Sequence, residues 1–109
     1  MRKSAVHRSS GNVFRDMGFS GPEAAELTAK SLLIDAISDT IAQRKLTQKE
    51  AAKLCETDQP TLSKVLRGRM ESVTIDRLAG WLTGLGRTVE IRVQPYNARK
   101  KEGHLVAVL

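Results

Sequence analysis

The stretch TQKEAAKLCETDQPTLSKVLRG, from Thr47 to Gly68, decides the fold. It holds two short amphipathic runs with only a few residues between them, and those residues can form a turn. Thr47 and Glu50 fit a capping box, in which a hydroxyl and a carboxylate accept hydrogen bonds from the backbone at a helix start. The first run therefore predicts a helix from Thr47 to about Cys55.

The second run predicts a helix over Gln59–Leu66. Asp58 is a favourable N-cap, Pro60 suits the first turn of a helix, and Gly68 suits the turn that ends one. Two short helices joined by a tight turn form a helix-turn-helix, in which the first helix supports the second and the second enters the major groove of DNA. Ala52 is the small residue that such a helix crossing needs.

The run from Pro22 to Lys45 precedes this motif and contains no internal glycine or proline. Ser20 and Glu23 fit a second capping box at its start. Apolar side chains then recur every four residues, as they do on one face of a helix; they are Leu33, Ile37 and Ile41. The run predicts one long helix, or two helices with a bend near residues 28–31.

The tail changes period after a last predicted helix over Ile75–Leu85. From Thr88 to Gln94 apolar and polar residues alternate, which is the pattern of a β-strand, with Val89, Ile91 and Val93 on one face. His104–Leu109 is a second β-prone run, so the tail predicts one strand or a hairpin. Because a lone hairpin is marginal in water, the strands must pack on the helices or pair with another copy of the chain.

The expected fold is mainly α, a bundle of four to five helices with a C-terminal β-strand or hairpin. We expect a basic N-terminal arm over 1–19, disordered before about residue 11, because residues 9–12 break any regular period. The helical domain is expected over 20–86. The C-terminal element over 87–109 is expected to serve dimerisation, with Val89, Ile91 and Val93 in the interface.

The chain has 109 residues, room for one domain, and a formal net charge of +6. A small basic protein is expected near polyanions, either nucleic acid or anionic lipid, although basic proteins can be merely soluble. Cys55 is the only cysteine, so no internal disulfide forms, and we expect it in the core. No apolar run is long enough to span a membrane and no secretory signal is visible, so we expect a cytoplasmic protein.

The residues give little support to an enzyme. No Gly-rich phosphate loop, zinc-ligand spacing or nucleophile elbow is present. Asp35 and Asp39 share a helix face, but nothing else converges on them. His7 and His104 lie in opposite tails without a paired ligand. We therefore expect no catalytic residues, no metal and no cofactor, and we expect Trp81 in the core or a dimer interface.

Eight polar side chains are candidates for contact with DNA, each with an ordinary alternative as a surface residue. In the first turn of the second helix, a glutamine can bond adenine and a threonine methyl can touch the thymine methyl. One turn later a lysine and a serine share or adjoin that face. Residues at the first helix start and around Gly68 are suited to phosphates. The set is Thr47, Gln48, Gln59, Thr61, Ser63, Lys64, Arg67 and Arg69.

The segment LTQKEAAKLCETDQPTLSKVLRG resembles the helix-turn-helix of the XRE family, the lambda-repressor-like and Cro-like DNA-binding domains. The resemblance covers roughly Leu32 to Leu85. It implies that Gln48 bonds a phosphate and braces the recognition helix. The sequence departs from the family at the turn, where Glu56 replaces the usual glycine and Thr57 an aliphatic residue. We expect Glu56 at or near a left-handed conformation, at a cost of about 1 kcal/mol relative to glycine.

The longer pattern resembles small XRE antitoxins of the HigA type, on the residues Gly11-Asn12-Val13-Phe14, Leu85-Gly86-Arg87, Val89–Val93 and the basic tail. This resemblance implies a homodimer that represses its own operon at an inverted repeat and neutralises a RelE- or HigB-like toxin. Two alternatives stay open. The chain is a stand-alone or phage-derived XRE regulator without a toxin, or it is mainly a protein-interaction module.

Overall fold

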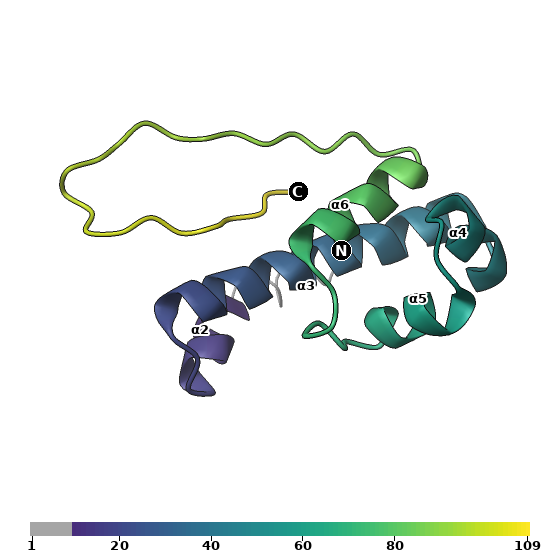
Figure 1. Ribbon diagram of the computed structural model, residues 1–109, viewed down its shortest axis with the longest axis horizontal. Coiled ribbons are helices and arrows are strands. Elements are labelled where there is room, and N and C mark those ends of the chain that lie inside the picture. Colours follow the sequence, from purple (N-terminus) through teal and green to yellow (C-terminus); the bar gives the residue numbers. More distant parts are fainter. Residues whose placement is uncertain (1–9) are drawn as a thin grey trace.

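The computed structural model describes residues 10–109, which form five helices. In chain order these are α2 (Ser10–Asp16), α3 (Gly21–Gln43), α4 (Gln48–Leu54), α5 (Gln59–Leu66) and α6 (Ile75–Gly84). The long α3 forms the spine of the molecule. In Figure 1, α2 packs at its N-terminal end, while α4, α5 and α6 gather around its C-terminal half. No helix of residues 10–109 is long and apolar enough to cross a membrane.

The predicted helix starts are confirmed. Ser20 with Glu23, and Thr47 with Glu50, form complete capping boxes at the starts of α3 and α4. Asp58 caps α5 and Thr74 caps α6 through their side-chain oxygens. Of the two readings of the long run, a single continuous α3 is correct.

All five described helices end in the same hydrogen-bonded turn, in which the residue after the C-cap adopts a positive φ. Glycine occupies this position after α2, α5 and α6, as Gly18, Gly68 and Gly86. After α4 it is Glu56, with a φ of 57°, which confirms the expected left-handed conformation. After α3 it is Lys45, with a φ of 55°, which the sequence analysis did not anticipate.

The core lies where α3, α5 and α6 meet. Its most deeply buried side chains are aliphatic: Ile37, Leu62, Val65, Leu78 and Leu85. Cys55 is also buried, which confirms its expected place in the core. Of the two readings of Trp81, core or dimer interface, the structure places it in the core. Leu33 and Ile41 pack at the edge of this cluster, as their spacing in α3 predicts.

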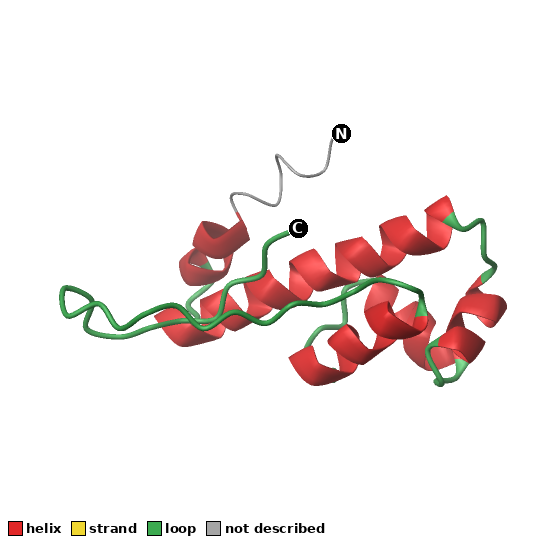
Figure 2. Cartoon of the chain, turned by 90° about the horizontal axis from the view of Figure 1, so that it is seen from above, coloured by secondary structure: helices red, strands yellow, loops and turns green. Residues whose placement is uncertain are grey.

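The predicted C-terminal strand or hairpin is wrong for the single chain. Residues 87–109 run outward from α6 and return, and no part of residues 10–109 forms a β-ladder (Figure 2). Ile91 and Val93 are 88% and 90% exposed. The alternation of the sequence favours an extended backbone, but a strand also needs a neighbour for its N–H and C=O groups, and residues 10–109 supply none.

Within the expected N-terminal arm, residues 10–16 form the helix α2, which the sequence did not predict. A short helix is marginal alone and depends on tertiary packing. That packing comes from α3 and from Phe14, whose ring meets the Phe19 ring edge-on with centroids 6.3 Å apart. Residues 1–9, with His7 and most of the expected disorder, lie outside the described part of the chain.

Candidate nucleic-acid interface

Helices α4 and α5 pack together as the predicted helix-turn-helix. One face of α5 is buried against the core through Leu62 and Val65. The α5 side chains off that face are exposed or half-buried, and they include Gln59, Thr61 and Lys64. A helix anchored on one side and polar on the other is the arrangement that allows side chains to reach base edges in a groove.

The eight candidate residues all lie at the surface of this motif, and none is fully buried. Gln59 and Lys64 of α5 are exposed, while Thr61 and Ser63 are half-buried. Arg67, just after α5, donates from Nη1 to the Ser63 hydroxyl oxygen at 2.8 Å, which joins two of the candidates. Arg69 is exposed in the following loop.

The remaining two candidates lie at the start of α4. The hydroxyl oxygen of Thr47 accepts the Glu50 N–H at 3.1 Å, so it is engaged as a cap. Gln48 is exposed in the first turn of α4. Both residues therefore lie where unpaired N–H groups of a helix point outward, a position suited to a phosphate.

The N-terminal end of α5 is braced by Arg77 of α6, which the sequence analysis missed. Its Nη2 donates to the Thr57 hydroxyl at 3.3 Å, and its guanidinium lies 5.7 Å from the centre of the Trp81 ring. The pKa of the Asp58 carboxyl is below its usual value, chiefly because Asp58 accepts hydrogen bonds from Thr61 and to a smaller extent because Arg77 is near. Arg77 thus links α6 to the turn that carries Glu56.

The C-terminal end of α5 is held by a second residue that the sequence analysis missed. Lys30 of α3 is only 6% exposed, and its Nζ donates to the Met70 carbonyl at 3.1 Å in the loop after α5. Glu26, one turn earlier, lies 3.4 Å from the same nitrogen. Lys30 precedes Ile34 by four residues and Ile37 by seven, so helical periodicity alone places it on the buried stripe of α3.

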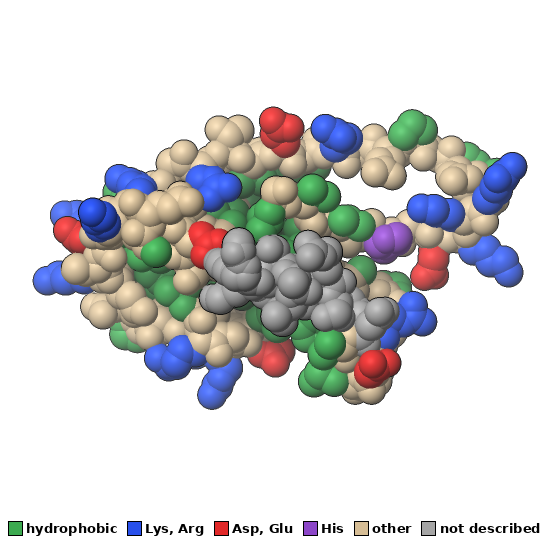
Figure 3. All heavy atoms as spheres, turned by 180° about the vertical axis from the view of Figure 1, so that it is seen from behind, with side chains coloured by type: hydrophobic (Ala, Val, Ile, Leu, Met, Phe, Trp, Pro, Cys, Tyr) green, Lys and Arg blue, Asp and Glu red, His purple; other side chains and the backbone are tan. Residues whose placement is uncertain are grey.

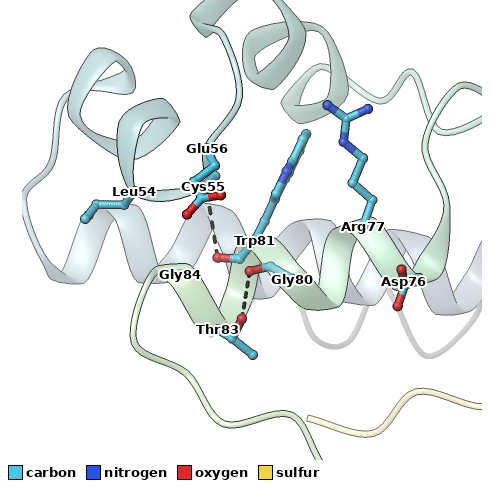
Figure 4. Close-up of a pocket in the computed structure, with 9 residues that line it drawn as sticks. All are labelled: Leu54, Cys55, Glu56, Asp76, Arg77, Gly80, Trp81, Thr83 and Gly84. Atoms are coloured by element: carbon cyan, nitrogen blue, oxygen red, sulfur yellow. Dashed lines mark hydrogen bonds between the residues drawn. The ribbon is translucent and has the colours of Figure 1, made fainter.

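A shallow depression lies beside the motif, between the end of α4 and α6 (Figure 4). Here α6 approaches the α4 backbone so closely that a Cβ on Gly84 would collide with the Leu54 carbonyl oxygen. Cys55 lies under this contact, with Sγ 3.7 Å from the Trp81 carbonyl oxygen. Burial raises the pKa of the Cys55 thiol to about 11, so this cysteine has no reactive thiolate at neutral pH.

The charged surface supports a polyanion partner. Figure 3 shows lysine and arginine side chains gathered at the end of the molecule formed by α4 and α5, and again at the tip of the tail. These two basic regions are at opposite ends of the molecule. The run from Arg99 to Lys101 therefore lies remote from the α5 of its own chain. Within residues 10–109, no group of His, Cys, Asp and Glu side chains is arranged to hold a metal ion.

Comparisons with known proteins agree with this geometry. A family model described as a helix-turn-helix domain matches residues 13–94. A solved structure described as an XRE family transcriptional regulator is 26% identical to the chain and superposes with a TM-score of 0.71. The match covers 81% of this chain and 99% of that one. No curated protein matches the chain. The chain therefore belongs to the helix-turn-helix domain family, a family of DNA-binding regulators and not of enzymes.

Proposed function

We propose that the chain is a sequence-specific transcriptional regulator that binds its operator as a homodimer and represses transcription. The main support is the orientation of α5, which is anchored in the core through Leu62 and Val65. Its other side presents polar side chains outward, Gln59, Thr61 and Lys64. The XRE regulator at 26% identity, aligned over nearly its whole length, supports the same function. In this proposal residues 20–86 bind DNA and residues 87–109 join the two copies, in the cytoplasm.

Base contacts come from the exposed side of α5. Gln59 donates and accepts at the N6 and N7 edge of an adenine, and the Thr61 methyl group packs on a thymine methyl. Lys64, one turn further, reaches a guanine edge or a phosphate. Ser63 lies next to this face, and its hydrogen bond with Arg67 keeps the hydroxyl in place.

Phosphate contacts surround these base contacts. Thr47 and Gln48 contribute from the start of α4, and Arg67 and Arg69 contribute from the far end of α5. Such contacts fix the register of the protein on the duplex and make binding steeply dependent on salt, because counterions are released. A dimer places two α5 helices about 34 Å apart, so the operator is an inverted repeat with half-sites one helical turn apart.

The test is binding of the purified protein to a duplex carrying its own promoter, against a scrambled duplex, at two salt concentrations. We expect a preference of about 10³-fold or more for the promoter, and a steep loss of affinity at the higher salt. Equal and weak binding to both duplexes would show that the chain is mainly a protein-interaction module.

The residue roles are tested by alanine substitution. Gln59→Ala should relax the preference at one base pair, costing about 1–3 kcal/mol on the native operator, while Arg67→Ala should weaken binding to all sequences about equally. Gln43→Ala, the same change at the exposed last residue of α3, is the matched control. If Gln59→Ala leaves the order of preference among operator variants unchanged, the assigned base contact is wrong.

We also propose that the regulator is the antitoxin of a toxin–antitoxin pair of the HigA type. The layout of the chain supports this role. A second support is a group of exposed apolar side chains in α2 and the loop after it, Val13, Met17 and Phe19, which lie outside the DNA-binding surface. Co-expression with a toxin-sized neighbouring reading frame should restore growth if that frame encodes a RelE- or HigB-like toxin. A chain starting at Ser20 that neutralises fully would exclude the N-terminal arm, and the absence of such a frame would favour the stand-alone regulator.

A further inference from the structure

The tail begins at a rigidly fixed point. Arg87 donates from Nη1 to the Thr40 hydroxyl of α3 at 2.9 Å, and Arg44 donates from Nη1 to the Leu85 carbonyl at 3.0 Å. Val89 packs at the edge of the core. These contacts attach the start of the tail to α3, so the extended segment leaves the body in one defined direction.

Beyond Val89 the tail runs away from the helices, turns and runs back. Its two extended arms, residues 90–95 and His104–Leu109, do not pair with each other. A turn between them is held by the Lys100 N–H, which donates to the Asn97 carbonyl at 3.0 Å. Among residues 10–109 this is the one backbone–backbone hydrogen bond within the tail. The arms run alongside α3 in Figures 1 and 2, and Figure 3 shows open space between them. The backbone groups of both arms are therefore available to another chain.

The two arms have different side-chain patterns. The first alternates, with Ile91 and Val93 on one face and charged or polar residues on the other, which suits a strand with one covered face. The second, LVAVL from Leu105 to Leu109, is apolar on both faces, which suits a strand covered on both sides. Yet Val106 and Val108 are exposed. An edge of this kind, left open, is a template for pairing with another chain.

We propose that the arms pair between two copies of the chain, and that His104–Leu109 of each copy is an inner strand of the resulting sheet. A second copy presents the same two unpaired arms from the same fixed root, so one two-fold axis satisfies both sets of backbone groups at once. The inference deepens the dimer of the proposed function and rests on it. It assigns the interface to both arms and makes the pairing intermolecular.

Mass measurement by light scattering tests the role of the last six residues. We expect the full chain to have twice the mass of its 12.0 kDa protomer, and the chain ending at Gly103 to have the protomer mass. Val108→Asp should act like the truncation, and Val13→Asp, which places the same charge at an exposed site of α2, should leave the dimer intact. A truncated chain that stays fully dimeric would overturn the proposal.

Cross-linking decides whether pairing is between or within chains. Two single-cysteine variants, Ile91→Cys and Val106→Cys, each with Cys55→Ala, are mixed and treated with a short bis-maleimide. We expect a cross-linked species of two chains that contains one of each variant. If mixing gives no such species while a chain carrying both cysteines closes on itself, pairing is intramolecular and the proposal fails.

The same samples distinguish a failure of the tail-pairing proposal from a failure of the proposed DNA-binding function. Specific promoter binding by a chain that neither doubles its mass nor cross-links between copies would overturn the tail pairing and leave the DNA-binding function standing. A cross-linked dimer with no preference for the promoter would support the pairing and overturn the function.

Discussion

Replacing Glu56 by glycine should stabilise the protein. Glu56 follows α4 with a φ of 57°, and its turn is closed by hydrogen bonds from the Glu56 N–H to Lys53 at 3.1 Å and from the Thr57 N–H to Ala52 at 3.0 Å. Glycine adopts this backbone without a Cβ penalty, and the hydrogen bonds of the turn do not involve the side chain.

The magnitude follows from two opposing terms. A left-handed conformation costs an L-residue about 1–2 kcal/mol, and glycine avoids this cost. Glycine, however, destabilises the fold by about 0.5–1 kcal/mol because its unfolded chain has more conformational freedom to lose. When the middle of each range is taken, the expected net gain is about 0.5–1 kcal/mol in the free energy of unfolding. For a domain of this size that is a rise of roughly 2–8 °C in the melting temperature.

Thermal and urea unfolding followed by circular dichroism measure this gain. Glu56→Ala keeps the Cβ and should change little, which separates the backbone effect from loss of the carboxylate. Lys45→Gly, at the matching position after α3 with a φ of 55°, should stabilise by a similar amount. Lys53→Gly, inside α4, should instead destabilise by about 1 kcal/mol. A Glu56→Gly variant that is destabilised as much as Lys53→Gly would refute the reasoning.

Three further changes follow from the geometry of α5 and α6. Gly84→Ala should destabilise the fold by about 1–3 kcal/mol in urea unfolding because the new methyl collides with the α4 backbone, whereas Gly80→Ala, which meets nothing within 4 Å, should be neutral or stabilising. Arg77→Ala should lower the affinity for the promoter more than the affinity for the scrambled duplex, because it frees the turn before α5. Equal losses of affinity on both duplexes would instead indicate a phosphate contact. The lowered pKa of Asp58 makes its contribution to stability complete above its unfolded pKa of about 3.9, and that contribution is lost as the pH falls through the lower folded value. Urea unfolding between pH 7 and 2 should therefore show the stability advantage of the native protein over Asp58→Ala shrinking below about pH 4, and an advantage that persists unchanged at pH 2 would contradict this cap.

The helical part of the fold was predictable because its signals are local. Capping residues such as Ser20, Thr47 and Asp58 act within one turn of chain, so their presence in the sequence already specifies a helix start. The left-handed Glu56 was predictable only by resemblance to a family that has glycine there. Lys45 adopts the same conformation after α3 without any such signal in the sequence.

The errors arose where structure depends on distant contacts. The helix α2 forms because Phe14 and Phe19 pack at the end of α3, which overrides the weak propensity of residues 9–12. The tail lacks a strand because alternation encodes an extended backbone but not the neighbour it needs. The roles of Arg77 and Lys30 could not be predicted because each contacts a residue far along the chain, Thr57 and Met70 respectively.

The bracing of α5 at both ends has a thermodynamic consequence. Arg77 and Lys30 hold the turn before the helix and the loop after it without any DNA present. Association with an operator then does not have to order the recognition helix. The heat capacity change of binding should reflect only the surface buried at the interface, without the larger negative contribution of a segment that folds as it binds. A recognition helix that is ordered before binding also loses less conformational entropy per contact, so a modest contact area suffices for tight binding.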